Sequence, residues 1–252
     1  MTTSVALANF ALGVIYSCYG VMTLIDLKRG WATLGPSHFG LAWVAMAFTC
    51  GPHHLEHGVH IATSGSAAGP LDLIAVLVGA PAGVTWFLLR VEALRGGSGD
   101  RFIPGTPRWV AALPALGAVY VGLAVAGAVW VLRDQAEFTP RITPNILLLG
   151  LYGLVGYYLL RAQLANHPDL GGWSLSGLCL TIVFPTCGLM HTAFAVYATS
   201  GRYSTDAYGL IIDWLAVPAA VYFVWVVRGL HQRRLSDWNL AGAGVVPEPA
   251  VA

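Results

Sequence analysis

Two stretches of the chain decide the fold, because each repeats the other. Residues 37–62 read SHFGLAWVAMAFTCGPHHLEHGVHIA, and residues 174–199 read SLSGLCLTIVFPTCGLMHTAFAVYAT. At an offset of 137, both contain Thr-Cys-Gly followed by a histidine three positions after the glycine (Thr49 to His54, Thr186 to His191). The offset continues through Leu73, Ile74, Pro81, Ala82 and Val84, which match Leu210, Ile211, Pro218, Ala219 and Val221. The sequence therefore predicts two copies of one structural unit.

The composition places these copies in a membrane. The 252 residues are 56% hydrophobic and only 10% charged, whereas a soluble domain carries about a quarter charged residues. This balance excludes disordered, collagen-like and disulfide-scaffold proteins. A net charge of +1 without a basic patch excludes a nucleic-acid binder. We expect an all-α integral membrane protein with the lipid bilayer as its surroundings, in the plasma or inner membrane.

Seven stretches have the length that a bilayer-spanning helix needs, which is about 20 apolar residues. The first three form repeat 1 (about 5–94), the fourth is a linker helix (109–132), and the last three form repeat 2 (about 142–231). Repeats that begin four spans apart point the same way, so a 3+1+3 parallel repeat is expected. We predict one domain over 1–238 and a disordered tail over 239–252. The spans are 5–27, 39–62, 71–94, 109–132, 144–165, 173–198 and 207–230.

Positive charges predict the orientation, because lysine and arginine gather in cytoplasmic loops. Ten of the thirteen fall in one set of loops, and three fall in the other (Arg133, Arg141 and Arg202). This distribution places the N-terminus outside and the C-terminus in the cytoplasm. The ten are Lys28, Arg29, Arg90, Arg95, Arg101, Arg108, Arg161, Arg228, Arg233 and Arg234.

The repeated motif predicts a metal site. Cys50 and His54 are four residues apart and share one helical face, as do Cys187 and His191. If the second and sixth spans are neighbours on a pseudo-two-fold axis, two thiolates and two imidazoles meet in the outer half of the bilayer. Such a set suits zinc or copper(I). The candidate metal ligands are Cys50, His53, His54, His57, His60, Cys187 and His191, and the candidate ions are copper, zinc and iron.

Other interpretations of these histidines remain open. His54 and His191 could be the two axial ligands of haem b, with Gly51 and Gly188 giving a porphyrin access to the backbone. A His-lined helix end at the outer surface would need no ligand. The spacing His53-x-x-Glu56-His57 resembles an inverted zinc-hydrolase motif, which implies Glu56 as a general base. Met190-His191-Thr192 resembles the Met-His-aromatic-Thr motif of MHYT sensor domains, which implies copper, although Thr192 stands in place of the aromatic residue.

A few acidic residues complete the candidate site. Asp213 is an acid within the seventh span, and we expect it to ligate an ion, orient a histidine or relay a proton. Asp72 begins the third span and is expected to cap it. Asp26 is expected to pair with Lys28 or Arg29.

Three functions fit this pattern. The first is a membrane metalloenzyme, an oxidoreductase, or a metal-handling protein with its site between the second and sixth spans. The second is a b-type cytochrome. The third is a small-solute or metal transporter, because the 3+1+3 topology resembles that of the SWEET sugar carriers. A retinal protein is excluded, since Lys28 is the only lysine and follows the first span. The pattern leaves a homo-oligomer or a membrane complex open.

Overall fold

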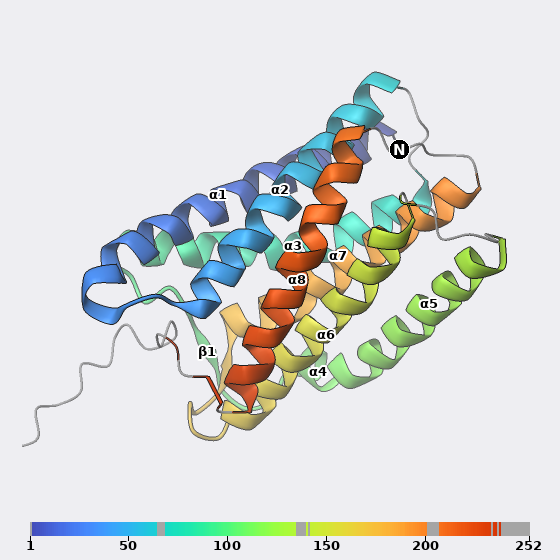
Figure 1. The fold of residues 1–252 in the computed structure, drawn as a ribbon. Helices are drawn as coiled ribbons and strands as arrows, with labels where there is room; N and C mark the ends of the chain where they lie inside the picture. Colours follow the sequence, from blue (N-terminus) through green and yellow to red (C-terminus); the bar gives the residue numbers. More distant parts are fainter. Residues whose placement is uncertain are drawn as a thin grey trace, which may run out of the picture.

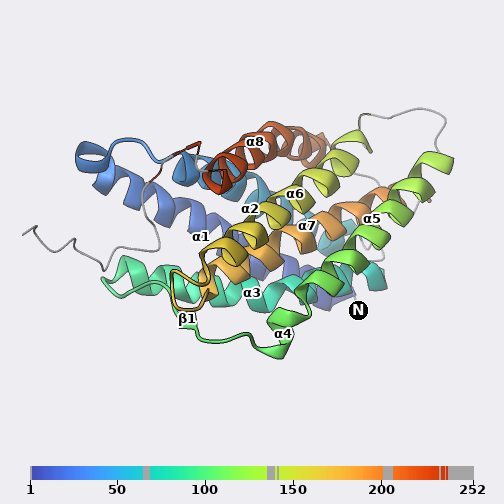
Figure 2. The ribbon, with the colours of Figure 1, turned by 90° about the horizontal axis from the view of Figure 1, so that it is seen from below.

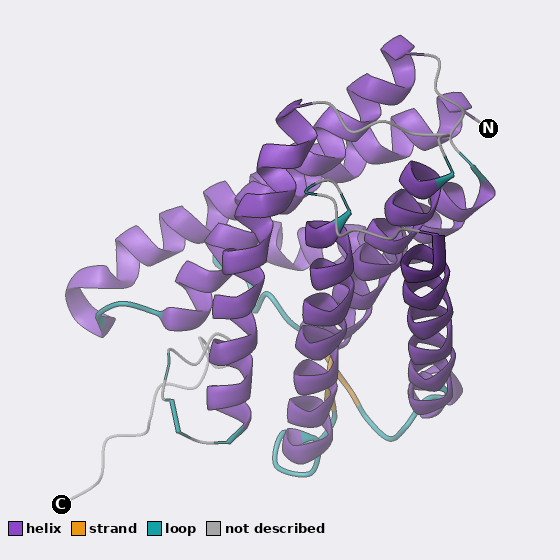
Figure 3. Ribbon diagram, turned by 45° about the vertical axis from the view of Figure 1, so that its right-hand side comes forward, coloured by secondary structure: helices purple, strands orange, loops and turns teal. Residues whose placement is uncertain are grey.

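The computed structural model describes residues 2–64, 69–134, 140, 142–200, 207–232, 234–235 and 237. Helices dominate these residues, with one pair of two-residue strands (Figures 1 and 3). The predicted tail and the positions of Arg141, Arg202 and Arg233 lie outside the described residues. The elements are α1 (Thr2–Leu34), α2 (His38–Ser64), α3 (Pro70–Leu94), β1 (Phe102–Ile103), α4 (Arg108–Ala111), α5 (Leu113–Asp134), α6 (Thr143–Asn166), β2 (Trp173–Ser174), α7 (Leu175–Thr199) and α8 (Ala207–His231).

Six of these helices are long and apolar enough to cross a membrane, as in a multi-pass membrane protein: α1, α3, α5, α6, α7 and α8. The seventh long helix, α2, falls short in hydropathy, and it carries Glu56 and four histidines between His53 and His60. Six of the seven predicted spans are therefore long and apolar enough to cross a membrane, and the span at α2 stays a prediction.

The six helices other than α4 and α5 pack in a closed ring. Its order is α1, α2, α8, α6, α7, α3 and back to α1 (Figure 2). The third helix of each predicted repeat thus packs against the second helix of the other, α3 on α7 and α8 on α2. We expected α2 and α7 to be neighbours, but their backbones make almost no direct contact. They meet only through side chains that reach into the ring.

Helix α5 lies outside the ring, at the edge of the bundle (Figure 1). It packs mainly on α7, and the Tyr120 hydroxyl donates to the backbone oxygen of Leu149 on α6 at 2.9 Å. The linker helix that we predicted as one piece over 109–132 is broken at Ala112, after the single turn α4. Pro114 explains the break, because proline lacks the N–H that would continue the helical bonds and disfavours helical backbone before it.

A buried acid fastens the loop after α3 to the start of α7. The Asp100 carboxylate accepts hydrogen bonds from the hydroxyls of Ser174 and Ser176, at 2.6 and 2.8 Å, and from the Ser176 backbone N–H at 2.9 Å. Beside it, Phe102 and Ile103 pair antiparallel with Ser174 and Trp173. Neither feature was predicted from the sequence.

The contact between α1 and α2 depends on glycine. A Cβ atom added at Gly51 would lie 2.8 Å from the backbone nitrogen of Ser17 and 3.2 Å from the oxygen of Gly13. The two backbones therefore touch at this level, directly beside the histidines of α2. At Gly117 on α5, by contrast, an added Cβ would meet nothing within 4 Å.

This difference predicts opposite effects of one substitution. Gly51→Ala should lower the free energy of unfolding by about 1–3 kcal/mol, because overpacking forces the helices apart. Gly117→Ala should raise it by about 0.5–1 kcal/mol, because alanine favours the helix and nothing opposes it. Thermal unfolding of the two variants in detergent measures both changes. Equal melting temperatures would contradict the close approach of α1 and α2.

Candidate metal centre

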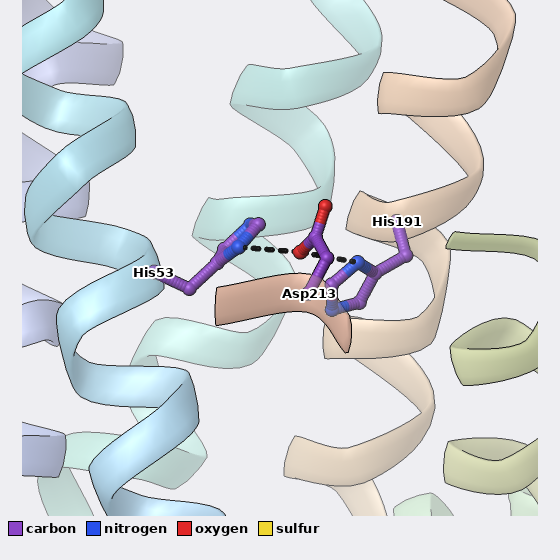
Figure 4. A group of neighbouring side chains, drawn as sticks. All are labelled: His53, His191 and Asp213. Atoms are coloured by element: carbon purple, nitrogen blue, oxygen red, sulfur yellow. Dashed lines mark ion pairs between the residues drawn. The ribbon is translucent and has the colours of Figure 1, made fainter. Parts of the chain in front are cut away.

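Three buried side chains from three helices converge inside the ring. They are His53 of α2, His191 of α7 and Asp213 of α8, with exposed fractions of 6%, 3% and 1% (Figure 4). One potential ligand atom from each lies within 4.8 Å of the other two. No other ligand atom of the described residues joins this group. The ring order brings them together, since α8 is the neighbour of α2 and α7 faces both across the interior.

The carboxylate of Asp213 lies between the two imidazoles. Its Oδ1 is 2.9 Å from Nδ1 of His53 and 3.9 Å from Nδ1 of His191. The shorter contact has the distance of an ion pair, which forms when His53 is protonated, but its atoms do not meet hydrogen-bond geometry among the described residues. Buried charged groups need a compensating partner. With His53 neutral, a cation between these two atoms would compensate the Asp213 carboxylate in place of the proton.

The other carboxylate oxygen is held by Asn145 of α6. The amide nitrogen of Asn145 donates to Asp213 Oδ2 at 3.0 Å, and its amide oxygen lies 2.7 Å from Nδ1 of His191. Because an amide oxygen only accepts, His191 carries its proton on Nδ1 and keeps a lone pair on Nε2 when neutral. A histidine that donates one N–H to a carbonyl oxygen is oriented in the way that metal-binding histidines usually are.

The first half of the chain contains the same pair. His54 Nδ1 lies 2.7 Å from the amide oxygen of Asn9, whose amide nitrogen donates to the backbone oxygen of Val5 at 2.9 Å. A tyrosine ring packs edge-on against each histidine, with centroids 5.2 Å apart for Tyr16 and His54 and 5.4 Å apart for Tyr152 and His191. The predicted partners His54 and His191 thus have matching surroundings.

Asn9 and Asn145 were not predicted as site residues. Their signal was an offset of 136, one less than in the later helices, which aligns Asn9 with Asn145 and Tyr16 with Tyr152. Leu12 with Leu148, and Gly20 with Gly156, follow the same offset. At the offset of 137 that joins the later helices, the first helix of each repeat agrees only at Leu12, Gly13 and Leu27. The offset of 136 aligns the two first helices and places one buried asparagine beside each histidine.

The predicted thiols lie beside the group rather than in it. The thiol of Cys50 is 3.2 Å from the Tyr152 hydroxyl, and Cys187 has Tyr16 as an electrostatic neighbour. All four cysteines are free in the structure. The composition had excluded a disulfide-scaffold protein. The structure thus gives each predicted Cys ligand a tyrosine neighbour.

The remaining predicted residues of α2 continue toward its end. His57 is buried with its ring against Phe194, centroids 4.1 Å apart, whereas Glu56 and His60 are half-buried. Asp72 caps α3 as expected, through the Gly69 backbone N–H at 2.9 Å. Asp26 does not pair with Lys28 or Arg29. It forms an ion pair with Arg90 of α3, because the ring places α3 beside α1.

The group is polar on one side of the ring only. At the offset of 137, Asp213 corresponds to Val76 of α3, and His53 corresponds to Met190 of α7. Val76 and Met190 are both 2% exposed and belong to the apolar core. The contact of α2 with α8 therefore carries an acid and a base, while the corresponding positions of α3 and α7 carry two apolar side chains.

The two glycines that were expected to give a porphyrin access to the backbone are closely packed. The space expected beside Gly51 is filled by Ser17 of α1, and a Cβ at Gly188 would lie 2.6 Å from the Tyr120 hydroxyl. Two imidazole nitrogens and a carboxylate oxygen, by contrast, are ordinary ligands of zinc and of iron.

Comparisons with protein-family models, with curated proteins and with solved structures found no match. The chemistry of the group therefore rests on its own residues. These are two oriented imidazoles and one carboxylate, buried in the interior of a helix bundle whose outer faces are apolar.

Proposed function

We propose that the protein is a metal-dependent membrane enzyme whose ion is held by His53, His191 and Asp213. The observation that carries the proposal is the convergence of three potential ligand atoms within 4.8 Å, from three helices, at buried positions inside the bundle. Ionisable residues inside membrane segments are costly and mark functional sites by default. A cation would compensate the Asp213 carboxylate and use the lone pairs that the imidazoles hold.

The ligand set favours an ion with free coordination positions. Three protein ligands are typical of catalytic sites, whereas structural zinc takes four. Two histidines and one carboxylate suit zinc or iron(II), and copper(I) would call for the thiols, which lie outside the group. Oxidisable side chains flank the site, namely the phenol of Tyr152 and the thiol of Cys50. For this reason we favour iron and an oxidoreductase. A bound ion would supply Lewis-acid or redox chemistry at this point.

We further propose that α2 is the seventh span. It lies in the ring between α1 and α8, which are both apolar enough to cross the membrane. Its buried histidines face the interior, where Asp213 and Asn9 meet His53 and His54. With the N-terminus outside, as the positive charges predict, the metal site belongs to the outer half of the bilayer, and the matched contacts of Asn9 and Asn145 support a pseudo-two-fold relation between the repeats.

A second candidate function is transport. Four ring helices contain an interior proline: Pro52 in α2, Pro81 in α3, Pro185 in α7 and Pro218 in α8. Prolines weaken a helix locally and permit bending. Uptake of the ion that the purified protein binds, measured in proteoliposomes, separates a carrier from an enzyme with a fixed ion.

The metal site predicts a specific pattern of occupancy. Loading the purified protein with iron(II) or zinc should give one ion per chain, measured by elemental analysis. His53→Ala, His191→Ala and Asp213→Ala should each reduce occupancy to background, because three ligands cannot lose one and hold the ion. Cys50→Ser, Cys187→Ser and His60→Ala should keep it. Loss of the ion in the cysteine variants instead would favour the Cys/His site predicted from the sequence.

The ion should also stabilise the fold. A ligand present at about 100 times its dissociation constant adds about 2.7 kcal/mol to the free energy of unfolding. Loading should therefore raise the melting temperature of the wild type, and a chelator should lower it again. Asp213→Asn keeps the size of the side chain and should abolish the response. A melting temperature that ignores both metal and chelator would refute the proposed site.

Asn145 and Asn9 offer a matched pair of positioning residues. Each accepts from a histidine at 2.7 Å, but only Asn145 also holds Asp213. Asn145→Leu should weaken metal binding roughly 10–100-fold, as the loss of outer-shell partners does elsewhere. Asn9→Leu should leave the affinity nearly unchanged. Titration of both variants with the ion measures the difference, and equal affinities would show that the Asn145 contacts do not serve the site.

A further inference from the structure

The His–Asp group lies close to one end of the ring and far from the other. Asp213 is the seventh residue of α8, and eighteen more residues follow it to His231. Asn145 is the third residue of α6, and His191 lies eight residues before the end of α7. At a rise of 1.5 Å per residue, the group is about 9–12 Å from the near end, where α8 begins and α7 ends, and about 27 Å from the far end along α8.

Aromatic side chains fill the interior between the group and the far end. The Tyr152 ring packs on Phe184, with centroids 5.9 Å apart. Phe184 in turn packs on Trp43 and Phe223, at 5.7 and 5.1 Å. These four residues come from α6, α7, α2 and α8, and each is at most 5% exposed. An ion that came from the far end would therefore have to part several interlocked rings.

On the near side, the group is covered by a pair of rings. His57 of α2 and Phe194 of α7 pack edge to face, with centroids 4.1 Å apart. Phe194 also packs against both imidazoles of the group, at 5.3 Å from His53 and 6.4 Å from His191. His57 and Phe194 are 2% and 4% exposed, whereas His60, one helical turn closer to the near end, is half-buried. The change from buried to accessible positions thus occurs within one turn of α2.

The pair also lies at the centre of the ring. At the offset of 137, His57 corresponds to Phe194, and His60 corresponds to Tyr197. Two residues that correspond through a two-fold axis can touch only if both lie beside that axis. The axis of parallel repeats runs along the membrane normal, so the pair stands in line between the group and the near end. Its imidazole is an ordinary metal ligand, whereas the phenyl ring has no lone pair to offer.

We propose that the metal ion enters and leaves through the near end, and that the His57–Phe194 pair is the barrier that it passes. The inference rests on the metal site proposed above and adds its route of exchange. Rotation of two side chains separates the rings without breaking a hydrogen bond of either helix. Once they part, His57 offers a nitrogen to the ion one helical turn before His53, on the same face of α2.

The test measures how fast zinc(II) exchanges in the full chain in detergent. Release is followed with an excess of the coloured chelator pyridylazoresorcinol, and loading by elemental analysis after rapid desalting. Phe194→Leu loses one ring and should speed both loading and release roughly 2–10-fold, the worth of one aromatic pair. His57→Phe keeps a ring but removes the nitrogen, and it should slow both rates. Because a barrier changes both rates alike, the dissociation constant of zinc should stay the same in both variants.

Phe184→Leu is the matched control, since it removes a buried ring from the same helix on the far side of the group. It should exchange zinc at the rates of the wild type. Faster exchange in Phe184→Leu than in Phe194→Leu would overturn the proposal in favour of entry from the far end. A higher dissociation constant in Phe194→Leu with an unchanged loading rate would also overturn it, because the ring would then only support the ligands.

The route and the metal site fail in different ways. A wild type that binds zinc but exchanges it at the same rates as Phe194→Leu and His57→Phe refutes the route and leaves the site intact. A wild type that takes up neither zinc nor iron(II) refutes the proposed function, and the route with it.

Discussion

The interior of the bundle is organised around one buried carboxylate, which needs polar partners to offset its charge. Asp213 is almost fully buried in a bundle with apolar outer faces, and every neighbouring polar group is arranged around it. His53 lies against one oxygen, Asn145 donates to the other, and His191 is oriented by the same asparagine. These partners come from α2, α6 and α7, and Asp213 itself comes from α8. Four of the six ring helices are therefore positioned by the surroundings of a single acid.

Hydrophobic length and the repeated motif in the sequence were sufficient to predict long helices, and the described residues agree with an apolar helical bundle. The break at Ala112, the two-residue strands and the partner of Asp26 depend on tertiary contacts, and sequence periodicity does not contain these. The ring order is the clearest case. Whether α8 packs on α7 of its own repeat or on α2 of the other decides which histidine lies against Asp213, and nothing in either helix alone indicates the answer.

The sequence named each residue of the candidate site, but it did not predict that these three residues would form one group. His53, His191 and Asp213 were each singled out from the sequence, yet the symmetry of Cys-x-x-x-His gave most weight to Cys50, His54 and Cys187. In the structure, that symmetry is carried by the hydrogen bonds of Asn9 and Asn145, and the converging group arises where the repeats differ. A duplicated framework with one altered pair of positions is harder to recognise than a duplicated motif, because the informative residues are the mismatches.

The position of Asp213 on α8 has a consequence for how the chain is assembled. Helices enter a membrane in the order of their synthesis, so that His53 and His191 are present before Asp213, the acid that lies between them. Helix α8 also closes the ring, since it alone joins α2 to α6 among the described contacts. Completion of the polar centre and closure of the bundle are therefore the same late event. A chain halted before residue 207 would hold all of its buried histidines in an open bundle, and a cell's membrane quality control could recognise it by that exposed interior.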